Sequence, residues 1–105
     1  MAQRARLLET VTPVRRAALL LEPESEVVSG WLQNTRRQKA REVERVFRAE
    51  LEGLAQRERG VVLAALVAAS AWTAWEGLRA HQRLSEGRSR AVMRTTLTAL
   101  LAPQR

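Results

Sequence analysis

Residues that could carry out acid–base or metal chemistry are few in this sequence. His81 is its one histidine, and it lies five residues after Glu76, which misses the i, i+4 spacing that places two ligands on one helical face. The chain has neither cysteine nor aspartate and no glycine-rich phosphate-binding motif. Glutamate pairs such as Glu42 and Glu44 are two positions apart and point to different sides of a helix. We therefore expect no enzyme activity, no metal site and no cofactor.

Large apolar side chains allow a different chemistry, the binding of a small molecule. Helical periodicity turns Trp31 and Phe47 inward on two elements, and the Leu63 to Val67 side of a third element turns inward with them. A pocket lined by such groups, with a few polar ones, suits a small lipophilic or cationic molecule. Aromatic residues at helical spacing are more often part of a filled core, and this alternative stays open. The candidate ligand-binding residues are Trp31, Phe47, Leu63, Leu66, Val67, Ser70 and Thr73.

The stretch Val61 to Trp75 is predicted to form the central, buried helix and to continue to about His81. It contains no proline or glycine and is dominated by alanine and leucine. Its fifteen residues are shorter than the ~20 needed to cross a bilayer, so we expect no membrane span. The helix has two apolar faces, and we expect one to face the chain's own core and the other a partner. The first face holds Val62, Leu63, Leu66, Val67 and Leu78, and the second holds Val61, Ala65, Ala68, Trp72 and Trp75.

The remaining segments also show helical periodicity. A first helix from Arg4 to about Leu21 is expected to be kinked or restarted at Pro13, with Thr12 as a plausible N-cap. Pro23 is expected to open a short second helix, weakened by Gly30.

Two further helices complete the predicted fold. Asn34 or Thr35 is expected to cap a third helix that runs to about Leu54. Ser85 caps the final helix, which Pro103 ends. The sequence thus predicts an all-α fold, an antiparallel bundle of about five helices, in one domain spanning residues 1–105.

The net charge of +7 invites a nucleic-acid interpretation, because clustered arginines neutralise phosphates. The stripe formed by Arg37, Arg41, Arg45 and Arg48 could hold phosphate, but no aromatic side chain is interleaved with it to stack on bases. Glutamates lie close enough to pair with it, so a solvated face is favoured. The absence of cysteine suits a reducing compartment, and no apolar signal segment follows the first arginines, so a cytoplasmic protein is expected.

Nearly the whole chain resembles part of a known family. The run LAALVAASAWTAWEGLRAHQRLSEGRSRAVMRTTLTALL, preceded by VERVFRAEL and RERG, resembles the C-terminal regulatory domain of TetR-family transcriptional regulators. The similarity covers roughly Pro13 to Leu101 and rests on a spacing pattern: a small-residue helix ending in tryptophans, a short polar loop, and a last helix rich in Arg, Val and Leu.

This resemblance implies a domain that senses a small lipophilic effector. It also implies a homodimer, formed through a four-helix bundle of the last two helices of each subunit, at about residues 57–81 and 86–102. Such a dimer would explain why these helices have two apolar faces. The implied interface residues are Ala65, Ala68, Trp72, Trp75, Ala91, Val92, Thr95 and Ala99.

The family's N-terminal helix-turn-helix domain, through which its members bind DNA, has no counterpart here, because residues 1–12 are too few to form it. We expect either a fragment of a longer regulator or a natural partial protein that pairs with a full-length relative. The alternative function is a stand-alone helical protein-interaction module, with nonspecific nucleic-acid affinity through its basic helix face.

Overall fold

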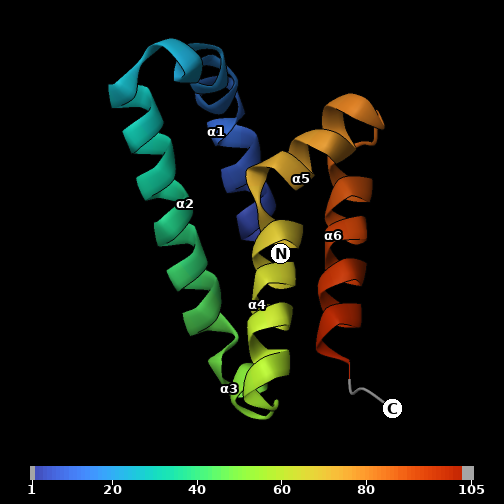
Figure 1. Cartoon of the computed structure of the whole chain (residues 1–105). Helices are drawn as coiled ribbons and strands as arrows, with labels where there is room; N and C mark the ends of the chain where they lie inside the picture. The colour runs from blue at the N-terminus through green and yellow to red at the C-terminus, as the bar shows by residue number, and fades with distance from the viewer. Residues whose placement is uncertain (1, 103–105) are drawn as a thin grey trace.

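The computed structural model describes residues 2–102, and within them every regular element is helical. The all-α prediction is therefore confirmed. The three longest helices are joined by shorter helical segments, as Figure 1 shows. The elements are α1 (Ala2–Leu21), the 3-10 turn η1 (Glu22–Glu24), α2 (Glu26–Val46), α3 (Arg48–Glu52), α4 (Gln56–Ser70), α5 (Trp72–Glu76), the π-helical turn η2 (Gly77–His81) and α6 (Glu86–Leu101).

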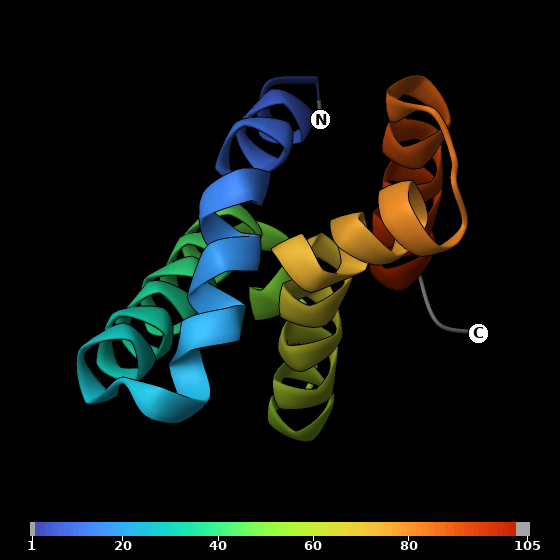
Figure 2. The same ribbon diagram turned by 90° about the horizontal axis from the view of Figure 1, so that it is seen from above.

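Helix α4 stands between α2 and α6, and α1 crosses the upper part of this row (Figure 1). Viewed from above, α5 and η2 lead away from the end of α4 toward α6, while α1 runs above α2 (Figure 2). One cluster of buried side chains joins all the long helices. Its members are Ala5, Leu8, Val43, Leu51, Leu66, Trp72, Trp75, Met93 and Leu97.

Helix α1 is unbroken through Pro13, so of the two predicted alternatives, a kink or a restart, the restart is wrong. Thr12 lies inside the helix and does not cap it. Its hydroxyl donates to the carbonyl oxygen of Leu8 at 2.7 Å, which is the i−4 bond that threonine makes in a helix interior. Because Pro13 lacks an N–H, the carbonyl of Glu9 loses its usual backbone donor without ending the helix.

One long helix, α2, replaces the short second helix and the start of the predicted third helix. The third helix was predicted to run to about Leu54, but the chain is interrupted at Phe47 and continues as α3 only to Glu52. Pro23 lies in η1, and the N-cap is Ser25, whose hydroxyl accepts from the amide of Val28 at 3.2 Å. Gly30 lies in the helix interior, where glycine costs only about 1 kcal/mol. Thr35 lies there too and donates to the carbonyl of Trp31 at 2.8 Å instead of capping a new helix.

The predicted central helix is broken at Ala71. Helix α4 ends at Ser70, Ala71 takes an extended conformation (ψ 157°), and α5 starts again at Trp72. The prediction of one helix from Val61 to His81 is therefore wrong, and the two halves meet at a bend of 47°. Within residues 2–102 no single helix is long and apolar enough to span a bilayer, while this bent pair passes on length and composition alone.

Helix α6 starts as predicted, because the Ser85 hydroxyl accepts from the amide of Arg88 at 3.1 Å. Its inner face carries Met93 and Leu97, both buried in the core cluster. The helix ends at Leu101, and the predicted terminator Pro103 lies outside the described residues.

Candidate ligand-binding pocket

A pocket of about 510 Å³ lies between α1, α2 and the break that separates α4 from α5. This volume falls in the range of small-molecule sites. Half of the apolar lining residues come from one side of α1, and the polar lining residues come from both α1 and α2. The apolar lining consists of Leu7, Leu8, Val11, Val14, Trp31, Val67, Ala71 and Trp72. The polar lining consists of Arg4, Thr10, Arg15, Thr35, Arg36, Gln38, Lys39 and Glu42.

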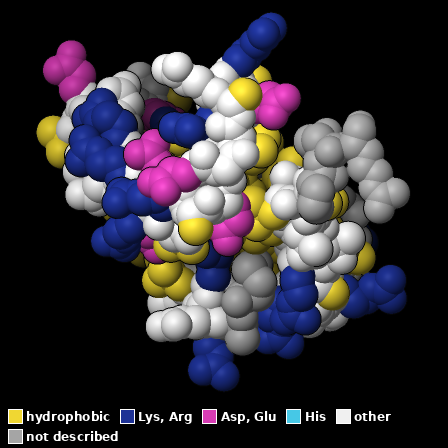
Figure 3. All heavy atoms as spheres, turned by 90° about the horizontal axis from the view of Figure 1, so that it is seen from below, with side chains coloured by type: hydrophobic (Ala, Val, Ile, Leu, Met, Phe, Trp, Pro, Cys, Tyr) yellow, Lys and Arg dark blue, Asp and Glu magenta, His cyan; other side chains and the backbone are white. Residues whose placement is uncertain are grey.

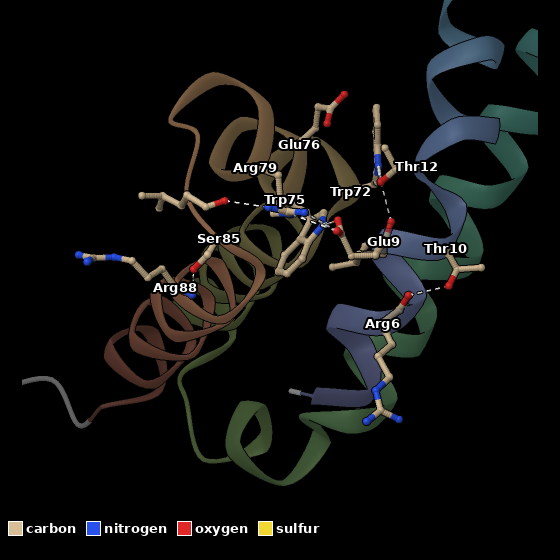
Figure 4. Close-up of polar contacts among 12 residues, drawn as sticks. Arg6, Glu9, Thr10, Thr12, Trp72, Trp75, Glu76, Arg79, Ser85 and Arg88 are labelled. Carbon is tan, nitrogen blue, oxygen red and sulfur yellow. Dashed lines mark hydrogen bonds and ion pairs between the residues drawn. The ribbon is translucent and has the colours of Figure 1, made fainter.

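The break at Ala71 brings Trp72 into this wall. The Trp72 side chain is only 5% exposed, and its indole nitrogen donates to the hydroxyl oxygen of Thr12 at 2.9 Å. The Thr12 hydroxyl donates in turn to the carbonyl of Leu8, so both polar groups are satisfied. The ring is thus held against α1 in one orientation, as Figure 4 shows.

A second group of contacts fixes α5 and η2 on α1 below the pocket wall. The indole nitrogen of Trp75 donates to one carboxylate oxygen of Glu9 at 2.7 Å, and Arg79 donates to the other at 2.7 Å (Figure 4). Arg79 also donates to the carbonyl of Leu84 at 2.9 Å. The hydrogen bond from Arg79 lowers the pKa of Glu9, assisted by that from Trp75 and opposed by desolvation.

A two-point ion pair supports the same docking. Arg16 of α1 donates through both Nε and Nη2 to the two carboxylate oxygens of Glu76 in α5, the second bond measuring 2.8 Å. This hydrogen bonding lowers the pKa of Glu76. Because a bidentate arginine pair fixes direction as well as distance, it adds a directional contact between α5 and α1.

Two basic side chains at the pocket are partly removed from solvent. The guanidinium carbon of Arg15 lies 5.8 Å from the centre of the Trp72 ring, at cation–π distance. Desolvation lowers the pKa of Arg15, and the nearby charge of Arg36 lowers it further. Desolvation also lowers the pKa of Lys39 to about 8, with a further contribution from the charge of Arg4.

The seven predicted ligand residues separate into three groups. Trp31 and Val67 line the pocket, and Thr73 lines an adjoining hollow of about 260 Å³ that shares Val67 and Trp72. Leu66 and Ser70 are buried, and Ser70 donates to the carbonyl of Leu66 at 2.7 Å. The structure does not bring these two to the pocket. Phe47 and Leu63 pack against the core cluster, and they also lie outside the pocket.

Sequence reasoning missed the contribution of α1. The side chains of Leu7, Val11 and Val14 follow an i, i+4, i+7 spacing, which marks one helical face. That signal was present, but it indicates an apolar face without telling whether the face meets a core or a pocket. Lys39, the one lysine in the chain, also lines this pocket and was not predicted to do so.

The predicted dimer residues also divide. Trp72 and Trp75 are 5% and 0% exposed within the chain itself, so they cannot form a partner-facing surface as predicted. The cause is the break at Ala71, which turns α5 onto α1. The others keep access to solvent: Ala65 is half-buried, and the exposed residues are Ala68, Ala91, Val92, Thr95 and Ala99.

The basic face and the histidine lie away from the pocket. Arg37, Arg41, Arg45 and Arg48 are all exposed, and none forms an ion pair within residues 2–102. From below, basic side chains project around the rim of the molecule, with carboxylates between them on one side (Figure 3). His81 is exposed, and in the described part of the chain no three potential metal ligands come together.

Comparisons of the chain with protein-family models, with curated proteins and with solved structures returned no match.

Proposed function

We propose that this chain is the ligand-sensing and dimerisation domain of a TetR-like transcriptional regulator, and that the pocket between α1, α2 and the helix break is its sensor. The observation that carries the proposal is the pocket itself, which combines a small-molecule volume and a large apolar wall with polar side chains contributed by α1 and α2.

The position of the pocket supports a sensing role. Val67 and Trp72 lie on opposite sides of Ala71, and both contribute to the wall. A ligand that contacts both therefore has a different affinity for different angles between α4 and α5. Such a difference in affinity is what a ligand needs in order to shift a conformational equilibrium.

The second apolar face supports dimerisation. Val61 of α4 is 69% exposed and Val92 of α6 is 40% exposed. Small residues accompany them on α6, at Ala91, Thr95 and Ala99, and these let a second helix approach closely. In the proposed mechanism, a ligand-driven change at the break alters how α4 and α6 present this face to the partner subunit.

A neutral fluorophore tests the sensor. N-phenyl-1-naphthylamine should show saturable fluorescence enhancement with the wild-type chain, because its uncharged rings fit an apolar wall. Leu7→Gln removes an apolar side chain of the wall and should weaken binding by about tenfold.

Leu21→Gln is the matched control. It makes the same change on the same helix outside the pocket, and it should bind like wild type. The two leucines are 60% and 53% exposed, so neither variant empties the core. Equal binding by both variants, or no saturable binding at all, would contradict the proposal.

An alternative function is a helical interaction module that contacts nucleic acid. It is favoured by the exposure of all four arginines of the predicted basic face. Binding of this kind depends on counterion release, so it should collapse between about 50 and 200 mM salt and show no sequence preference. Duplex binding with this salt sensitivity and no sequence preference, in a chain that shows no saturable binding of the neutral fluorophore, would favour the alternative over the sensor.

A further inference from the structure

The polar edge of the pocket carries a marked excess of positive charge. Four of its lining residues are basic, Arg4, Arg15, Arg36 and Lys39, and Glu42 is the one carboxylate among them. The apolar wall lies directly beside this edge in the same pocket. The pocket thus combines an apolar wall with an excess of positively charged side chains.

Two of the four cations are already paired. Arg4 lies 3.4 Å from the carboxylate of Glu42, and Arg36 lies 3.4 Å from that of Glu22. Among the described residues, neither Arg15 nor Lys39 has a carboxylate partner within ion-pair distance. These two side chains are both half-buried, so water screens their charges incompletely.

The neighbouring cations, one paired and one unpaired, act on Lys39. The charges of Arg4 and Arg15 both disfavour the protonated form of Lys39, and Glu42 opposes them only in part. An anion placed beside Lys39 would stabilise its protonated form, because the anion offsets both the cost of desolvation and the repulsion from the other cations.

We propose that the ligand is an apolar molecule with a carboxylate head group, seated with its chain along the α1 wall and its carboxylate between Lys39 and Arg15. This inference rests on the proposed function and narrows it from any lipophilic effector to a lipophilic anion. A cationic ligand, which the sequence left open, is disfavoured by the same charges.

The pH dependence follows from the groups around Lys39, namely Arg4, Arg15 and Glu42. A fatty carboxylate is ionised above about pH 5, and Lys39, with its pKa of about 8, is charged below that value. Preference for the anion should therefore be greatest near pH 7 and fall as the pH rises past about 8.

The test compares decanoate, 1-decanol and decylammonium as competitors of N-phenyl-1-naphthylamine at pH about 7 and at submicellar concentration. Decanoate should displace the fluorophore at about tenfold lower concentration than 1-decanol, and decylammonium should be the weakest. Lys39→Met should abolish the preference for decanoate over 1-decanol. Arg15→Gln provides a second variant with the same expected loss.

Arg41→Met, on the exposed side of α2, is the control and should bind both compounds like wild type. Equal displacement by decanoate and 1-decanol in the wild-type chain would overturn the carboxylate assignment and leave the sensor proposal standing. Loss of all saturable binding of the neutral fluorophore would instead overturn both.

Discussion

The indole nitrogen of Trp72 lies 2.9 Å from the hydroxyl oxygen of Thr12, sixty residues earlier in the chain. This hydrogen bond connects the first residue after the helix break to the middle of α1. It also places an aromatic ring in the pocket wall, over which Arg15 stacks. This buried contact therefore links the break, the pocket wall and the docking of α1.

Removing the hydroxyl of Thr12 should destabilise the fold. Thr12→Val leaves the buried indole N–H of Trp72 without an acceptor, which costs about 1–3 kcal/mol. Thr10→Val is the control, because Thr10 is exposed and bonds only to the carbonyl of Arg6 in the same helix. Urea denaturation should show a change within about 0.5 kcal/mol for the control.

A double variant checks the assignment. Thr12→Val combined with Trp72→Phe removes donor and acceptor together, so it should be less destabilised than the sum of the single changes. Strict additivity of the two substitutions would show that this contact does not couple them.

The Glu9 cluster should make stability depend on acid pH. Its folded-state pKa lies below the ordinary value of 4.5, so the ionised carboxylate is favoured in the folded state. The stabilisation is present above about pH 4.5 and is lost as the pH falls through the folded pKa.

Glu9→Gln should lose about 1–3 kcal/mol at neutral pH and show a shallower decline in acid. Part of the loss of stability at acid pH should persist in this variant, because the pKa of Glu76 is also lowered in the folded state. Glu44→Gln, at an exposed position, should behave like wild type when unfolding is measured across this pH range. An acid slope in Glu9→Gln equal to that of wild type would contradict the assignment.

Alanine substitutions at two serines near the start of α6 should change the stability of the fold in opposite directions. Ser89 is fully buried, and its hydroxyl has no hydrogen-bond partner within the described part of the chain. Ser89→Ala should raise stability by about 1 kcal/mol, because an unsatisfied polar group leaves the core. Ser85→Ala should lower it by about 1 kcal/mol, because the N-cap is lost. Thermal unfolding that moves both in one direction would be inconsistent with this account.

The dimer should be sensitive to charge on the outer face of α6. At micromolar concentration, sedimentation equilibrium should give twice the chain mass of 11.8 kDa. Ala99→Arg should weaken association, whereas Ala49→Arg, the same change at an exposed position on α3, should not. A wild-type chain that stays monomeric at high concentration would remove the case for this interface.

Helical content and the start of α6 could be predicted from local sequence. Alternating strand patterns are absent, and Ser85 has the usual N-cap position before an apolar period. Gly30 misled the prediction, since a single glycine lowers helix propensity without forcing an end when the flanking residues favour a helix.

The break at Ala71 could not be predicted in the same way. The residues around it are alanine, valine, serine and tryptophan, with neither glycine nor proline. Tertiary contacts decide it, because Trp72 and Trp75 reach their partners on α1 only if α5 turns away from α4. The pocket depends on that turn, so most of its lining could not be predicted from the periodicity of each helix taken separately.

The three tryptophans allow the central claim to be tested in one spectrum. Trp31 and Trp72 line the pocket, and Trp75 is fully buried outside it. In a two-dimensional proton–nitrogen NMR titration with N-phenyl-1-naphthylamine, with signals assigned through single Trp→Phe variants, the indole signals of Trp31 and Trp72 should shift and that of Trp75 should move least. Saturable binding that shifts Trp75 alone, or shifts none of the three, would contradict a sensor pocket at this place.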